Sequence, residues 1–267
     1  MKHIFIGYIT LVIFSGCKLN SDNIGTPENE GAVISDTLDD NWIHLFDGKT
    51  TEGWRGYNAN VLPPNWVVLD GVLTFDVNRK IDKEYAGGKD IIYAAEKYDN
   101  FELHVEWKIP KGGNSGILYH VQEGAEYAGP YEVAPEYQLI DDHNYAEIHD
   151  LEAYNKSLGY ENPSQLHPLQ KTGADYAMYP ADENKKKLNP AEEWNTSKIV
   201  FTEEKVEHWL NGDMILSFVP WSDDWNQKKE NGKWRDNKDY GTFKSGYICL
   251  QDHDSPLWFK NIKIKKL

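Results

Sequence analysis

The segment FELHVEWKI, residues 101–109, alternates apolar and polar side chains without interruption. Successive side chains of a β-strand point to opposite faces, so this period of two puts every apolar residue of the segment on one face. The glutamates, the histidine and the lysine lie on the other face. We therefore expect 101–109 to be a strand of an antiparallel sheet, with one buried face and one solvated face.

Turn signals on both sides of this strand divide the rest of the chain into further short strands. In WVVLDGVLTF (66–75), Asp70-Gly71 separates two apolar runs, which is a strong hairpin signal. KIVFTEEKVEHWLNGDMILSF (198–218) has turns at Glu203-Glu204 and Asn211-Gly212 and indicates three strands. Other strand-like runs are SGILYHV (115–121), GYICLQDH (246–253) and LWFKNIKIKKL (257–267). No segment sustains a 3.6-residue period, so we predict an all-β sandwich of two antiparallel sheets.

Composition limits the class of partner. The chain has 267 residues, of which 40% are hydrophobic, enough for the core of a domain. Its formal charge of −15 argues against a nucleic-acid partner, which would need a basic surface. Ten Trp, 16 Tyr and 9 Phe favour strands, and exposed aromatic rings can stack on sugars. Composition does not predict an oligomeric state.

The first 40 residues are expected to lie outside the folded domain, which we place at 41–267. The apolar run 4–14 has the length of a signal-peptide core and is too short to span a membrane. It ends in Ser15-Gly16-Cys17, which resembles a bacterial lipobox and implies cleavage before Cys17 and lipidation of that residue. We predict a signal peptide at 1–16, a flexible polar tether at 17–40, and lipid anchoring at the bacterial outer membrane. Ordinary secretion with an incidental cysteine is the alternative.

The stretch PEYQLIDDHNY, 135–145, combines alternation with a polar cluster. On a strand, Glu136 and Gln138 share one face, and Tyr137 and Leu139 share the other. If the two apolar side chains enter the core, Glu136 and Gln138 face a groove. The acidic and histidine residues that follow lack a recognised metal-ligand spacing, so a solvated loop is favoured, although loop oxygens could hold calcium. They are Asp141, Asp142, His143, Glu147, His149 and Asp150.

Several catalytic signatures are missing from the sequence, and one histidine has two interpretations. There is no G-x-S-x-G, no Gly-rich phosphate loop and no H-E-x-x-H. His208 shares a strand face with Val206 and Leu210, which indicates a buried or partly buried side. It could be a functional group at a groove or a histidine of the core, and the pattern leaves both open.

Seven segments, in order, resemble the 3-keto-disaccharide (3-keto-glucoside) hydrolase family. They are LFDGKTTEGW, GGNSGILYHV, PEYQLIDD, GADYAMY, EEWN, VEHWLNG and GYICLQDHDSPLWFKNIKIK. The resemblance extends from about Trp42 to Lys265. It implies a concanavalin A-like jelly-roll sandwich, a site on its concave sheet, a carbohydrate substrate, and secretion or lipid anchoring. The chain departs from the family pattern at Cys249 and in the loop 156–190.

A 3-keto sugar implies its own chemistry. The ketone at C3 acidifies the C2 proton, a base removes it, the enolate expels the aglycone from C1, and water adds later. Such a site needs a base, an acid and a group that holds the enolate oxygen. It does not need the two opposed carboxylates of an ordinary glycosidase, and the chain has no E-x-D-x-E strand.

With this resemblance, roles can be assigned to individual residues. Glu136 is expected to be the general base, His208 the acid or enolate partner, and Asp141 a further catalytic candidate. Expected ligands of sugar hydroxyls or the keto oxygen are Asn114, Gln138, Gln251 and His253, and possible ring platforms are Trp54, Tyr119 and Trp209. No cofactor is expected, although a divalent cation such as calcium is compatible. An ordinary glycoside hydrolase and a non-catalytic carbohydrate-binding lipoprotein are the alternative functions.

Overall fold

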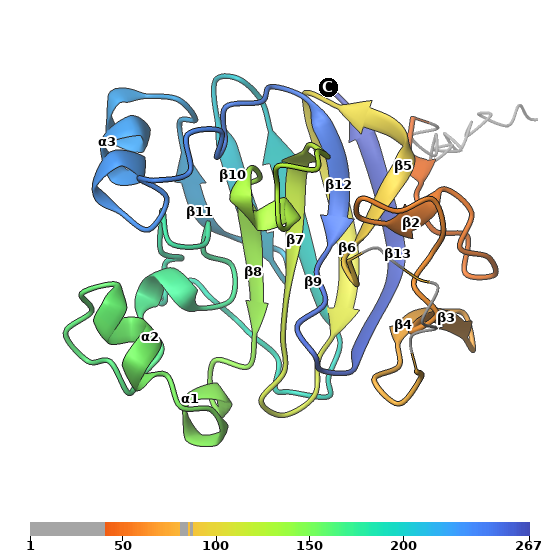
Figure 1. The fold of residues 1–267 in the computed structure, drawn as a ribbon, viewed down its shortest axis with the longest axis horizontal. Coiled ribbons are helices and arrows are strands. Elements are labelled where there is room, and N and C mark those ends of the chain that lie inside the picture. Colours follow the sequence, from red (N-terminus) through yellow and green to blue (C-terminus); the bar gives the residue numbers. More distant parts are fainter. Residues whose placement is uncertain (1–40, 81–84, 86–87) are drawn as a thin grey trace, which may run out of the picture. The chain divides into compact units, whose positions relative to one another are not determined.

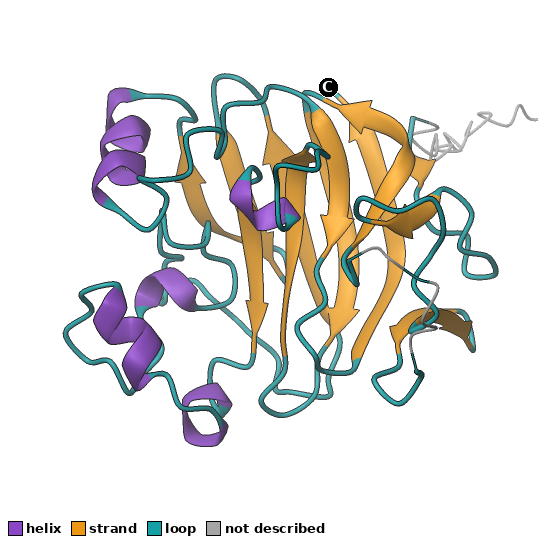
Figure 2. Ribbon diagram, in the orientation of Figure 1, coloured by secondary structure: helices purple, strands orange, loops and turns teal. Residues whose placement is uncertain are grey.

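The computed structural model describes residues 41–80, 85 and 88–267. Thirteen strands in this part of the chain form two antiparallel sheets that pack face to face (Figures 1 and 2). The predicted fold class, an all-β jelly-roll sandwich of two antiparallel sheets, is confirmed. The predicted signal peptide, tether and Cys17 lie outside the described residues. Within the described ranges, no helix is both long and apolar enough to cross a bilayer.

The larger sheet has eight strands in the order β11-β10-β9-β6-β13-β4-β3, with β1 paired to β13. These strands are β1 Ile43–His44, β3 Trp66–Leu69, β4 Val72–Phe75, β6 Phe101–Lys108, β9 Asn195–Phe201, β10 Val206–Leu210, β11 Asp213–Phe218 and β13 Leu257–Lys266. The smaller sheet has five strands in the order β2-β5-β12-β7-β8. They are β2 Trp54–Gly56, β5 Ile91–Tyr98, β12 Gly246–Leu250, β7 Asn114–Val121 and β8 Glu136–Ile140. The chain crosses between the sheets repeatedly, so strands far apart in sequence, such as β5 and β12, become neighbours.

The alternation of the sequence matches the burial of the strands. Along β6, Phe101, Leu103, Val105 and Trp107 are buried, and the residues between them are only partly buried. The predicted hairpin between β3 and β4 is present, with positive φ angles at Asp70 (50°) and Gly71 (79°). Two positive φ values are what a type I′ turn requires, and they explain the Asp-Gly pair at this position.

Helical segments are short, and the longest, α3, lacks an apolar stripe. They are α1 Tyr145–Ile148, α2 Glu152–Ser157, α3 Asp223–Asn231 and the 3₁₀ turns η1 Pro130–Glu132 and η2 Pro168–Gln170. Of the nine residues of α3, only Trp225 is buried. The helix is fixed instead by its ends: the hydroxyl of Ser222 accepts a hydrogen bond from the backbone N–H of Trp225, and lysines occupy the last turn. In Figure 1, α1, α2 and α3 lie on the β8 and β11 side of the sandwich.

Candidate active site

The predicted alternation of the stretch at 135–145 is confirmed for its first half. Tyr137 and Leu139 are fully buried in the core between the sheets. Glu136 and Gln138 take the opposite face of β8, where both line a cavity of about 410 Å³. This volume falls within the range of about 300–1,000 Å³ that is usual for small-molecule sites.

The five-stranded sheet forms the floor of the cavity, and loops form its walls. In the antiparallel pair of β7 and β8, Gly116 lies opposite Gln138 and Asn114 opposite Ile140. Floor residues are therefore Asn114, Glu136, Gln138 and Ile140, joined by Gln251 and His253 just after β12. Wall residues are Tyr131, Tyr145, Asp150, Leu151, Tyr154, Leu166, Gln170, Tyr176, Lys233 and Trp234.

Glu136 is an unpaired acid in this floor. It is only 4% exposed, and within the described part of the chain its carboxylate has neither a hydrogen bond nor an ion pair. A Cβ at Gly116 would overlap the carboxylate, so glycine on the neighbouring strand is what gives Glu136 its room. Burial raises the pKa of Glu136 to about 8, against the opposing effect of the Lys233 charge, and Asp90 adds a small further rise. A carboxyl with this pKa can exchange a proton near neutral pH.

Beside Glu136, two amide side chains orient each other. Gln138 donates a hydrogen bond from Nε2 to Oδ1 of Asn114 at 2.9 Å, and the Asn114 amide lies 3.5 Å from the hydroxyl of Tyr145. Gln251 is held next to them because its backbone N–H donates to the carbonyl of Gly116. Together these amides offer both donors and acceptors to a polar ligand such as a sugar.

Tyrosine and tryptophan side chains form the wall facing this polar floor. The hydroxyls of Tyr154 and Tyr176 are 2.9 Å apart, and the ring of Trp234 lies 6.2 Å from that of Tyr176. Burial raises the pKa of Tyr176 well above its ordinary value, with the neighbouring Tyr154 adding to the effect, so its hydroxyl keeps its proton. A ring wall opposite amide groups suits a ligand with an apolar face and polar edges.

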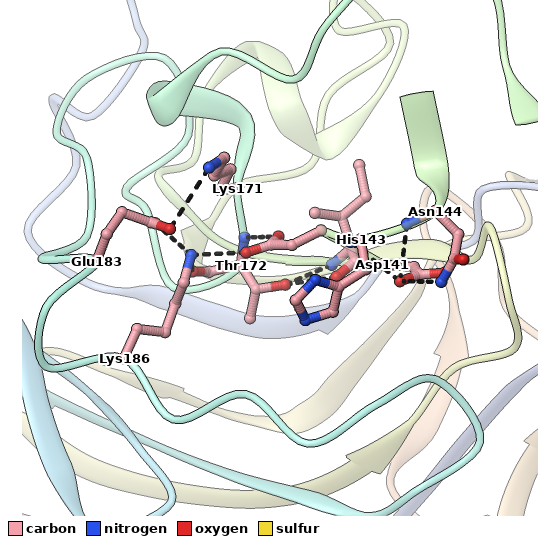
Figure 3. Close-up of polar contacts among 9 residues, drawn as sticks. Asp141, His143, Asn144, Lys171, Thr172, Glu183 and Lys186 are labelled. Atoms are coloured by element: carbon pink, nitrogen blue, oxygen red, sulfur yellow. Dashed lines mark hydrogen bonds and ion pairs between the residues drawn. The ribbon is translucent and has the colours of Figure 1, made fainter. Parts of the chain in front are cut away.

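Immediately after β8, the acidic residue Asp141 stabilises a turn. The carboxylate of Asp141 accepts hydrogen bonds from the backbone N–H groups of Gly112 and His143. It also accepts them from the backbone N–H and the side chain of Asn144 (Figure 3). It is thus fully engaged in the turn and does not line the cavity. The expectation that Asp141 takes part in catalysis is corrected on this ground: its oxygens already hold the turn together.

Asp142 fixes the long loop that the sequence left unpatterned. It accepts a hydrogen bond from the N–H of Thr172 and pairs with Lys186 at 2.6 Å. Lys186 also pairs with Glu183, as Figure 3 shows. These bonds tie the loop 156–190 to the end of β8, and the loop in turn supplies cavity walls such as Tyr176. Among the residues that the structure describes, no group of three His, Cys, Asp or Glu side chains could hold a metal ion.

His208 does not reach the cavity. It lies on β10 in the eight-stranded sheet, is completely buried, and shares the core face with Val206 and Leu210. Its Nδ1 is 3.0 Å from the carbonyl oxygen of Gly173, and burial lowers its pKa to about 4. The expectation that His208 is the acid or the enolate partner is therefore corrected, because the residue lies outside the cavity. The alternative, a histidine of the core, fits its position.

The three predicted ring platforms also lie elsewhere. Trp54 is buried, with its indole N–H donating to the carbonyl of Leu45. Tyr119 is on the core face of β7, because Asn114 and Gly116 take the cavity face. Trp209 lies on the outer face of the other sheet, with the ammonium of Lys198 3.8 Å from its ring centre. The structure thus brings together Glu136, Gln138, Asn114, Gln251 and His253, and not the other predicted residues.

Sequence reasoning missed most of the wall, and it missed one buried acid. Tyr154, Tyr176 and Lys233 sit in segments without a strand or helix pattern, so nothing in the sequence assigned them a face. Asp175 is completely buried, and neither of its carboxylate oxygens has a partner in the described part of the chain. Burial, and then the nearby Glu136, raises its pKa well above the ordinary value, which favours the protonated form of this carboxyl.

Comparisons with known proteins agree over nearly the whole described domain. A family model for the 3-keto-alpha-glucoside-1,2-lyase-like domain matches residues 41–265. A 3-keto-disaccharide hydrolase of Bacteroides thetaiotaomicron is 35% identical over 246 residues, which are 85% of this chain and 79% of that protein. Two solved structures from Parabacteroides distasonis, each described as a candidate glycosyl hydrolase, cover 85% of this chain. One has 41% identity and a TM-score of 0.72 over 94% of its own length. The other has 26% identity and a TM-score of 0.58 over 99%.

Proposed function

The chain belongs to the family of 3-keto-alpha-glucoside-1,2-lyase-like domains and acts on glycosidic bonds, and we propose that it cleaves 3-keto-glycosides by C2 proton abstraction. In this reaction Glu136 is the general base, and the aglycone leaves by elimination. The enzyme then hydrates the product or releases it as the unsaturated sugar.

One observation carries the proposal: a buried glutamate, unpaired among the described residues, faces a cavity beside amides that can bind a sugar. A C2 proton next to a ketone is only weakly acidic, so its removal needs a base stronger than an ordinary carboxylate. Burial raises the pKa of Glu136 to about 8 and so makes its ionised form such a base. Asn114, Gln138 and Gln251 would hold the sugar hydroxyls and thereby present C2 to the carboxylate.

The elimination has two steps, formation of the enolate and loss of the aglycone. Glu136 takes the C2 proton, the C2–H pair becomes the C2=C3 bond, and the carbonyl pair moves onto the C3 oxygen. In the second step, the electron pair on the C3 oxygen re-forms the carbonyl, and the C2=C3 pair becomes the C1=C2 bond. The aglycone leaves with the electron pair of the C1–O bond and gains a proton. Addition of water, oxygen to C1 and hydrogen to C2, completes net hydrolysis.

The carboxylates at the cavity also favour this mechanism over that of an ordinary glycosidase. An ordinary glycosidase uses two carboxyl groups that flank the scissile bond. Besides Glu136, the described lining contains one other carboxylate, Asp150, which is exposed. Its Oδ1 accepts the backbone N–H of Glu152 at the start of α2, so it is engaged in the helix start.

The test uses a 3-keto-glucoside that carries deuterium at C2, alongside the unoxidised glucoside. We expect aglycone release from the keto substrate alone, with loss of the C2 deuterium to water. The reaction should persist after dialysis against a chelator, because the proposed steps use side chains of this chain. If C2 retains its deuterium through turnover, or if the unoxidised glucoside is cleaved equally fast, elimination is wrong and ordinary glycoside hydrolysis replaces it.

We also propose that the protein is anchored to the bacterial outer membrane by lipid on Cys17. The support is the apolar run that ends in Ser15-Gly16-Cys17. Mass spectrometry of the native protein should find a lipidated residue 17 at the N-terminus, and Cys17→Ser should release the protein from membranes. An unmodified N-terminus at another residue would contradict the anchor.

A further inference from the structure

Lys233 is a cation in the cavity wall that no acidic side chain of the described residues neutralises. Within the described residues its ammonium forms neither an ion pair nor a hydrogen bond. It lies instead 4.3 Å from the ring centres of both Tyr176 and Trp234, and 5.6 Å from that of Tyr154. Aromatic faces stabilise a cation without cancelling its charge, so the positive charge of Lys233 stays available to a ligand.

The segment that follows α3 holds Lys233 in this place. Trp234 is buried, donates its indole N–H to the carbonyl of Tyr176, and stacks on Tyr240 with ring centres 4.3 Å apart. Lys229 closes the same segment by donating hydrogen bonds to the carbonyls of Lys238 and Tyr240. The position of Lys233 is thus set by neighbours on both sides.

Lys233 differs from two other lysines of this part of the chain, which form ion pairs with acidic side chains. Lys228 pairs with Asp224 at 3.1 Å, and Lys186 pairs with Asp142. Lys233 and Glu136 line the same cavity, close enough for the lysine charge to lower the pKa of that glutamate against the effect of burial. The cavity therefore combines an acid in its floor with a cation in its wall, and neither has a partner among the described residues.

We propose that Lys233 is a catalytic residue that holds the negative charge developing on the C3 oxygen while Glu136 removes the C2 proton. This role rests on the proposed function and supplies the enolate partner that His208 cannot be. The ammonium is not consumed: it faces the oxygen while the carbonyl pair resides there and is released when that pair re-forms the ketone. Preorganised donors aimed at developing charge typically contribute about a hundred- to a thousand-fold in rate.

The first measurement compares variants on a chromogenic 3-keto aryl glucoside. Lys233→Met should lower kcat about a hundredfold and change KM far less, while Lys233→Arg should restore part of the rate. The matched control is Lys228→Met, which removes a lysine that lies over the Tyr179 ring but does not line the cavity, and which should keep wild-type kcat. Melting temperatures verify that all three variants fold.

A second measurement isolates enolate formation from loss of the aglycone. The 1-deoxy analogue of 3-keto-glucose has no leaving group, so exchange of its C2 hydrogen in heavy water reports proton removal alone. Lys233→Met should slow this enzyme-catalysed exchange by about the same factor as kcat, because proton removal is the step that the charge assists. If exchange stays at the wild-type rate while cleavage falls, Lys233 protonates the leaving oxygen and the enolate role is wrong.

The pH profile gives a signature that a purely structural role would not produce. Removing the Lys233 charge should raise the pKa of Glu136 and move the acid limb of kcat/KM to higher pH. The other groups that interact electrostatically with Glu136 are unchanged in this variant: Asp90, Asp175, Tyr176, Tyr240 and Cys249. A rise in KM with unchanged kcat would make Lys233 a ligand of the aglycone and overturn the proposal. Wild-type protein that does not release the aglycone at all would instead overturn the proposed function itself.

Discussion

The two halves of one short stretch, 135–145, carry acidic side chains that differ in their hydrogen bonding. In β8, Glu136 is buried, has no partner among the described residues, and has a raised pKa. A few residues later, Asp141 is equally buried, but its carboxylate accepts three backbone N–H groups and a side-chain amide. Burial is therefore the same for both, and what distinguishes them is the supply of hydrogen-bond donors.

This difference separates reactive groups from structural ones. The oxygens of Asp141 are already occupied by N–H donors, so this carboxylate is committed to its turn. A buried carboxylate without donors is destabilised as the anion, as the raised pKa of Glu136 reflects, and is therefore the stronger base. We expect substitutions in the first half of the stretch to change chemistry and substitutions in the second half to change stability.

The largest effect is expected at Glu136. Glu136→Gln keeps the size of the side chain but cannot accept a proton, so turnover of a 3-keto-glucoside should fall about a hundred- to ten-thousand-fold. The control is Glu102→Gln on the outer face of β6, which should leave turnover within about twofold. A loss at Glu136 of less than about tenfold would remove this residue from the base role.

The same substitution should change how stability depends on pH. The folded-state pKa of Glu136 is about 8 and the ordinary value is 4.5, so between these pH values the folded protein keeps a proton that the unfolded chain has released. The free energy of unfolding of the wild type must therefore fall across this window, by at most about 5 kcal/mol for this group, and level off above it. Glu136→Gln lacks this titration and should gain stability over the wild type between pH 5 and pH 9. Urea unfolding of both proteins at these two pH values measures the difference, and an equal gap at both would contradict the raised pKa.

A smaller effect, on stability alone, is expected in the second half of the stretch. Asp141→Ala removes the acceptor of three backbone N–H groups, so the free energy of unfolding should fall by about 2–3 kcal/mol. The protein that remains folded should keep its turnover within about threefold. Asp236→Ala, at an exposed aspartate, should be nearly neutral. Unchanged stability with a large loss of turnover would reverse the comparison and return Asp141 to a catalytic role.

What the sequence determined by itself was local. The period of two in 101–109, the Asp-Gly and Asn-Gly turns and the alternation around Glu136 depend only on neighbouring residues, because each strand residue takes the face opposite to the one before it. These patterns were enough for the fold class and for the shared face of Glu136 and Gln138. Ordered motifs over the whole chain pointed to the family, which the comparisons then established.

Only the tertiary structure decided which groups pack against each face of a strand. His208 shares a face with Val206 and Leu210, as the sequence indicated, but only the packing of the two sheets makes that face the core. Likewise, Lys233 lies in a segment without a local pattern, and contacts with residues far away in sequence bring it to the cavity. The hydrogen-bond donors that satisfy Asp141 come from the surrounding fold as well as from the local turn. The same fold brings no donor of the described residues to the carboxylate of Glu136. The physical reason is that alternation fixes direction within a strand, whereas burial, partners and pKa depend on groups that long-range folding brings together.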